Sequence, residues 1–278
     1  MSEISDTRSM AVFCDFENIA IGVREAKFDR FDIRLVLEKL LLKGPIIVKK
    51  AYCDWTRYKE FKAAMHEAAF ELIDVPHLSQ SGKNSADIRL VVDALDLCYT
   101  KPHVQTFVII SGDSDFSPLV SKLRENNKTV IGVGVKNSSS DLLIANCDEF
   151  ILYDDLARAR GAESARRSRK ADTAAKGDST TASASSGRKS KSDPAGEGIA
   201  HVLDVVEELL AERGERGKVW GSMVKQTLKR RRPEFNESYH GFRSFNALLE
   251  EAHRRGLLQL ERDDRSGGYV ITGVRHDA

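Results

Sequence analysis

A stretch of the chain from residue 157 to residue 198 contains no Val, Ile, Leu, Met, Phe, Trp or Tyr. Small, polar and charged residues with a single Pro make up this stretch, and they bury too little apolar surface to offset the entropy lost on ordering. We therefore predict a flexible linker over residues 157–198. It divides the 278-residue chain into two modules, residues 1–156 and residues 199–278.

The net charge of +1 conceals an uneven distribution of charged side chains. The first module carries 19 basic and 24 acidic side chains, the linker carries 10 and 5, and the second module carries 14 and 13. Without a bound cation, the acidic first module is a poor partner for a polyanion. The basic linker would attract RNA through salt-sensitive contacts that do not depend on base sequence.

The chain shows no sign of secretion or of membrane insertion. No apolar run approaches the roughly 18 residues of a membrane span, and the polar N-terminus lacks the pattern of a signal peptide. The four cysteines lie far apart without the spacing of a zinc or redox motif, so we expect them to be buried and free. These features predict a soluble, cytoplasmic protein.

Short apolar runs alternate with helical patterns in the first module. This alternation predicts an α/β fold with a mostly parallel sheet covered by helices on both faces. The predicted strands are residues 10–14, 46–53, 105–110, 129–135 and 150–153. The predicted helices are residues 32–42, 56–69, 86–98, 118–126 and 140–145. In such sheets functional groups gather at the carboxyl ends of the strands.

Acidic residues stand at these strand ends. Asp113 and Asp115 lie in a turn directly after a predicted strand, and Asp15 ends the first strand. Asp87 falls in the first turn of a predicted helix, where taken alone it is more simply explained as a helix cap. Glu17 neighbours Asp15, but strand alternation would direct it elsewhere if the strand continues past Asp15.

Several carboxylates crowded at one sheet edge would not all stay ionised without a cation. Oxygen ligands without His or Cys suit Mg²⁺ or Mn²⁺, ions that promote phosphoryl displacement. Asn18 would orient a ligand or contact a phosphate, and Lys83 would either neutralise a phosphate or remain solvated. The candidate ligands, direct or through water, are Asp15, Asp87, Asp113 and Asp115.

Three segments, residues 12–18 (VFCDFEN), 83–87 (KNSAD) and 110–116 (ISGDSDF), resemble the NYN family of PIN-like ribonucleases over roughly residues 10–156. The resemblance implies a Rossmann-like PIN fold and Mg²⁺- or Mn²⁺-dependent cleavage of RNA. It also implies that the matching acids Asp15, Asp87, Asp113 and Asp115 are metal ligands. Asp141 would be either an outer member of this set or a helix cap.

The second module shows three helical patterns, residues 199–213, 222–230 and 242–255, followed by two short strands around a turn at residues 263–268. This order predicts a winged helix-turn-helix. Residues 217–220 (GKVW) and 239–245 (YHGFRSF) resemble the OST-HTH, or LOTUS, domain, which implies binding of RNA or of a protein partner. Basic residues here are either phosphate contacts or solvated side chains. They are Lys225, Lys229, Arg230, Arg231 and Arg243.

Two other functions remain open besides a metal-dependent ribonuclease. A phosphatase of the haloacid dehalogenase type also uses an Asp at a strand end, but Glu17 stands where a second Asp is usual. A non-catalytic RNA-binding or adaptor protein would keep the acidic pocket as a structural remnant. The complete set of aspartates favours the ribonuclease.

Overall fold

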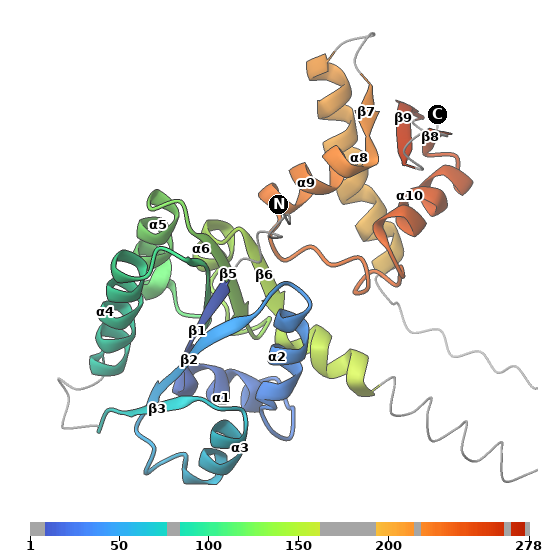
Figure 1. The fold of residues 1–278 in the computed structure, drawn as a ribbon. Coiled ribbons are helices and arrows are strands. Elements are labelled where there is room, and N and C mark those ends of the chain that lie inside the picture. Colours follow the sequence, from blue (N-terminus) through green and yellow to red (C-terminus); the bar gives the residue numbers. More distant parts are fainter. Residues whose placement is uncertain (1–8, 77–83, 162–192, 214–217, 264–267, 276–278) are drawn as a thin grey trace, which may run out of the picture. The chain divides into compact units, whose positions relative to one another are not determined.

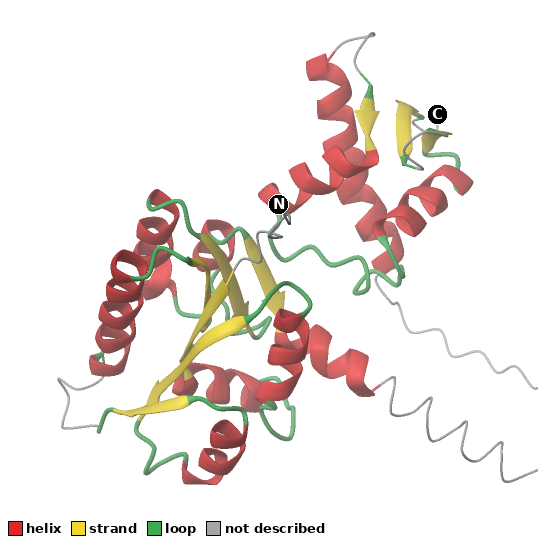
Figure 2. Cartoon of the chain, in the orientation of Figure 1, coloured by secondary structure: helices red, strands yellow, loops and turns green. Residues whose placement is uncertain are grey.

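The computed structural model describes residues 9–76, 84–161, 193–213, 218–263 and 268–275. The chain divides into two compact units, Met1–Ala165 and Arg166–Ala278. The first unit is α/β with a parallel sheet, and the second contains helices and a small antiparallel sheet (Figures 1 and 2). The predicted fold class is confirmed.

Six parallel strands form the sheet of the first unit, in the order β3-β2-β1-β4-β5-β6. They are β1 (Ser9–Asp15), β2 (Ile46–Cys53), β3 (Glu71–Asp74), β4 (Val104–Ile110), β5 (Thr129–Gly134) and β6 (Glu149–Leu152). The strand order reverses between β1 and β4, which lie side by side. A crevice opens at such a reversal, outside the carboxyl ends of the two strands.

Helices cover both faces of this sheet, as Figure 1 shows. One face packs against α1 (Phe16–Glu25), α2 (Ile33–Leu41) and α3 (Lys62–Glu67). The other packs against α4 (Ser85–Thr100), α5 (Ser117–Glu125) and α6 (Asp141–Asn146). Because both faces are covered, the central strands are nearly continuous in buried apolar residues.

The sequence patterns did not predict α1 or β3. The α1 helix begins at Phe16, directly after β1, because the Asp15 side chain accepts a hydrogen bond from the backbone N–H of Asn18 and caps the helix. The second element is β3, a short edge strand. The predicted helix over residues 56–69 is shorter than expected, a 3₁₀ turn at Lys59–Phe61 followed by α3.

The second unit contains α8 (Pro194–Arg213), β7 (Val219–Trp220), α9 (Gly221–Arg231), α10 (Phe245–Arg254), β8 (Leu258–Arg262) and β9 (Tyr269–Val274). Its sheet has the order β7-β9-β8 with antiparallel pairing. The α10 helix begins three residues later than predicted, because Ser244 accepts a hydrogen bond from the N–H of Ala247 and forms the cap. The three helices and the sheet share one apolar core.

Helical residues reach into the predicted linker at both ends. Residues 153–161 are helical, and α8 begins at Pro194. The remainder of the predicted linker, residues 162–192, lies outside the described residues. All four cysteines are buried and free, as predicted. Within the described segments, no helix is long and apolar enough to cross a membrane.

Candidate functional site

Asp15 ends β1 and is only 7% exposed. One carboxylate oxygen, Oδ2, accepts a hydrogen bond of 3.0 Å from the Ser111 hydroxyl, which follows the neighbouring strand β4. The other oxygen, Oδ1, accepts the cap hydrogen bond of 3.3 Å from the N–H of Asn18. Burial, and then the charge of Asp87, raise the pKa of Asp15 to about 7.

The turn after β4 is built around Gly112. Its N–H donates a 2.9 Å hydrogen bond to Oδ1 of Asn18, so Asn18 joins the ends of β1 and β4. A Cβ atom at residue 112 would lie 2.3 Å from the carbonyl oxygen of Ser138, which leaves room for glycine alone. Asp113 then accepts a 2.9 Å hydrogen bond from the N–H of Asp115 and caps a short 3₁₀ turn.

Asp87 enters the same region from α4. It lies in the first turn of this helix, and Asn84 occupies the N-cap position. The alternative in which Asp87 caps the helix is therefore wrong. Burial, followed by the charges of Asp113 and Asp115, raises the pKa of Asp87 to about 6. Electrostatic interactions thus connect Asp87 both with Asp15 and with the turn after β4.

Glu17 also interacts electrostatically with these carboxylates, and the condition for directing it elsewhere, a strand that continues past Asp15, is not met. Because β1 stops at Asp15 and α1 begins at Phe16, strand alternation does not extend to Glu17. The charge of Glu17 contributes to the raised pKa of Asp87. Its carboxylate pairs with Arg57 at 2.9 Å, and the Arg57 side chain is 53% exposed.

Sequence reasoning missed two residues that the structure brings to this region. Ser111 precedes the Gly112 turn, and its hydroxyl both donates to Asp15 and accepts from the N–H of Asp113 at 3.2 Å. Its position between an apolar strand and a glycine could have indicated a site residue. Arg57 belongs to no recognisable motif, and only the fold brings it to Glu17.

The carboxylates fit a hard divalent cation by their chemistry. All of the donor atoms are oxygen, and the raised pKa values of Asp15 and Asp87 reflect burial together with neighbouring negative charge. A cation would relieve that repulsion. In the described part of the chain, no three His, Cys, Asp or Glu side chains are already arranged to hold an ion.

Other predicted site residues lie elsewhere or cannot be placed. Lys83 falls outside the described residues. Asp141 is exposed at the start of α6, where Ser140 rather than Asp141 forms the cap. Asp141 therefore does not cap α6.

The basic residues of the second unit are in part neutralised by acidic neighbours. Lys225 pairs with Glu237 at 2.6 Å, and Arg231 pairs with Glu208. The α9 helix also carries Lys229 and Arg230, and Arg243 is exposed shortly before α10.

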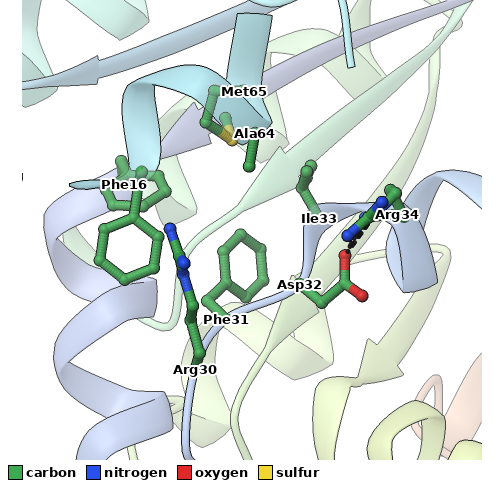
Figure 3. A pocket seen from close by; sticks show the side chains of 9 residues that line it. Phe16, Arg30, Phe31, Asp32, Ile33, Arg34, Ala64 and Met65 are labelled. Carbon is green, nitrogen blue, oxygen red and sulfur yellow. Dashed lines mark hydrogen bonds and ion pairs between the residues drawn. The ribbon is translucent and has the colours of Figure 1, made fainter. Parts of the chain in front are cut away.

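A separate cavity of about 230 Å³ lies on the α1–α3 face of the first unit (Figure 3). Aromatic rings of Phe16, Phe31 and Phe61 line it, and the Arg30 guanidinium lies 4.5 Å from the centre of the Phe61 ring. Asp32 is the single carboxylate among its lining residues and pairs with Arg34 at 3.2 Å. The cavity is therefore distinct from the acidic cluster.

The NYN domain matches residues 9–154, more than half of the chain. The chain belongs to the NYN domain family. This family is part of the PIN-like nuclease superfamily, whose domains generally use divalent metals. The sequence-based resemblance to NYN proteins is confirmed.

Two proteins similar to this NYN chain have no described function. An uncharacterized protein of Methanocaldococcus jannaschii is 28% identical over 129 residues, which cover 46% of this chain and 49% of that protein. The chain thus spans about half the length of this relative. The crystal structure of a protein of unknown function from Vibrio parahaemolyticus is 26% identical, with a TM-score of 0.50. That match covers 56% of this chain and 98% of the other.

Proposed function

We propose that this NYN protein is a ribonuclease that cleaves RNA phosphodiester bonds with Mg²⁺ or Mn²⁺. The observation that supports the proposal is the buried Asp15 carboxylate at the end of β1 in a PIN-like fold, where the charges of Asp87 and Asp113 help to raise its pKa. Such a cluster repels a phosphate on its own, so a cation is needed before RNA can approach.

The proposed ligands and the residues that position them have different roles in this proposal. A bound ion would activate water and stabilise charge on the phosphate. Asn18 holds the Gly112 turn against β1 through its 2.9 Å hydrogen bond, which fixes the spacing between the two acidic segments. Ser111 orients the Asp15 carboxylate. The proposed ligands are Asp15, Asp87, Asp113 and Asp115.

The second unit would act as an OST-HTH (LOTUS) module that captures RNA and presents it to the first unit. Its helices and small antiparallel sheet are compatible with that domain. The proposed RNA contacts in this unit are Lys225, Lys229, Arg230, Arg231 and Arg243, and Lys83 is the proposed contact in the first unit. If this unit binds a protein partner in place of RNA, its removal would leave the affinity of the chain for RNA unchanged.

The decisive experiment incubates labelled single-stranded RNA with the full chain in Mn²⁺, Mg²⁺ or EDTA. Asp113→Asn keeps a side chain that can cap the 3₁₀ turn but removes the charge, so we expect cleavage to be lost while the fold persists. Asp96→Asn is the matched control, because Asp96 is exposed on α4, remote from Asp87 along the helix. Cleavage that survives EDTA, or that survives Asp113→Asn, contradicts the proposal.

The same assay separates the other two functions. Release of phosphate from a generic phosphomonoester without cleavage of RNA favours the phosphatase. Metal-independent binding of RNA without turnover favours the adaptor. Either outcome replaces the ribonuclease proposal.

A further inference from the structure

The outer face of α4 carries a row of exposed apolar side chains. Ile88 is 62% exposed, Val92 is 55% exposed and Tyr99 is 63% exposed. Leu95, between them, is partly buried. Such side chains are costly to leave in water when they form a continuous row, so a row of this kind marks a contact surface.

The spacing of this row differs from that of the buried face of the same helix. Leu90, Ala94 and Cys98 face the core at intervals of four residues. The exposed row follows intervals of four, three and four residues, which is the 3.5-residue repeat of helices that pack against another helix. This outer stripe, defined as Ile88, Val92, Leu95 and Tyr99, therefore has the pattern of a helix–helix seam.

Charged residues flank the outer stripe in a self-complementary way. Arg89 and Asp96 are both exposed and lie on the same side of the stripe, because the seven residues that separate them are about two helical turns. Arg89 also pairs with Asp93 of its own helix at 3.1 Å and remains 58% exposed. If a second α4 runs antiparallel against the first, Ile88 meets Tyr99 and Val92 meets Leu95. Arg89 of each copy then lies beside Asp96 of the other.

We propose that the outer stripe of α4 is the surface through which two copies of this chain associate as an antiparallel pair. A second copy of the chain would cover the apolar stripe and would also pair the opposite charges, because both come from the same short segment. Two-fold symmetry requires such self-complementarity. The surface is independent of the proposed nuclease activity.

The size of the stripe sets the strength of the association. A stable interface buries about 800 Å² on each partner, which is more than the exposed face of one 16-residue helix supplies. The pair is therefore weak and reversible, and it forms at high protein concentration.

Sedimentation equilibrium of the full chain, from micromolar to hundreds of micromolar, tests this association. We expect the mean mass to rise toward that of a dimer, and we expect Val92→Glu to keep the chain monomeric. Leu142→Glu is the control, because Leu142 is also 58% exposed but lies on α6, and this variant should still dimerise. A wild-type chain that stays monomeric, or a Val92→Glu chain that dimerises normally, overturns the proposal.

A mixing experiment tests the antiparallel geometry and guards against misfolding of a variant. Asp96→Arg alone places Arg beside Arg89 of the other copy, and Arg89→Glu alone places Glu beside Asp96, so each should dimerise at least about tenfold more weakly. Because Arg89→Glu also removes the ion pair with Asp93, urea unfolding first checks that this variant is folded. In an equal mixture every such contact joins opposite charges, and a mixed dimer should form. Failure of the mixture to associate overturns the antiparallel arrangement.

Discussion

Asp15 is a carboxyl group whose protonation depends on its burial in the fold. Its pKa of about 7 in the folded protein exceeds the ordinary value of 3.8. The folded state therefore holds this proton more tightly than the unfolded state does. The resulting stabilisation is fully present below about pH 4 and is lost as the pH rises through about 7. Asp87, with a pKa of about 6, acts in the same direction.

We expect Asp15→Asn to raise the free energy of unfolding of the metal-free protein at pH 8 by about 1–3 kcal/mol, because it removes a buried charge. At pH 4, where Asp15 is largely neutral, the difference should be much smaller. Urea unfolding at the two pH values measures this. Equal stabilisation at both pH values would show that Asp15 is not the titrating group.

The Gly112 turn leaves no space for a side chain. We expect Gly112→Ala to destabilise the protein by about 1–3 kcal/mol, because the added methyl group would overlap the Ser138 carbonyl oxygen. Displacement of the turn should also lower the rate of RNA cleavage. Thermal unfolding and the cleavage assay provide the two measurements. Gly161→Ala is the control, since no atom lies within 4 Å of a Cβ built there.

At the scale of elements, a polar network connects α4 with the sheet. Asp93 on α4 accepts hydrogen bonds from Tyr52 on β2 at 2.9 Å, from Lys50 at 3.2 Å and from Arg89 at 3.1 Å. Tyr52 is fully buried, and its hydroxyl depends on this contact. Asp93 thereby fixes the helix that carries Asp87.

We expect Asp93→Asn to destabilise the protein by about 1–3 kcal/mol. The neutral amide weakens the interactions with Lys50 and Arg89, and its NH₂ group cannot accept the hydrogen bond from the Tyr52 hydroxyl. Loss of a fixed position for α4 should also weaken metal binding through Asp87. Urea unfolding and Mn²⁺ titration followed by calorimetry measure the two effects. Asp96→Asn, an exposed change on the same helix, should alter neither.

Sequence patterns predicted the central elements because those strands are buried on both faces and are read as apolar runs. The β3 strand escaped prediction because its four residues, Glu71–Asp74, begin and end with acids and lie at the sheet edge. The α1 helix was not predicted because no turn residue separates it from β1. The early end of β1 also means that strand alternation does not decide where Glu17 lies.

Motifs at strand ends predicted where the acids gather, but not how they contact each other. Asp15, Asp113 and Asp115 followed from topology, since β1 and β4 are parallel neighbours. Whether Asp87 was a cap or a site residue depended on the position of α4 relative to the sheet. Arg57 depended on the tertiary contact with Glu17, which no local pattern contains.

At the scale of the whole molecule, two units with separate cores share one chain. We expect removal of residues 199–278 to weaken RNA binding while the cleavage of short oligonucleotides continues at its former rate. The reason is that tethering raises the effective concentration of a captured strand near the acidic cluster. Fluorescence anisotropy measures the affinity for RNA, and cleavage of matched long and short substrates measures the rates, for the full and the shortened chain. Unchanged affinity for long RNA would contradict this role.

Gly112 lies in close backbone contact with the segment at Ser138. Backbone meets backbone there, and the N–H of Ser140 donates a 2.8 Å hydrogen bond to the Gly112 carbonyl. Backbone contacts thus fix the Gly112 side of the acidic cluster, whereas Asp87 belongs to the first turn of α4. Any displacement of the Gly112 turn would therefore carry residues 138–140 with it.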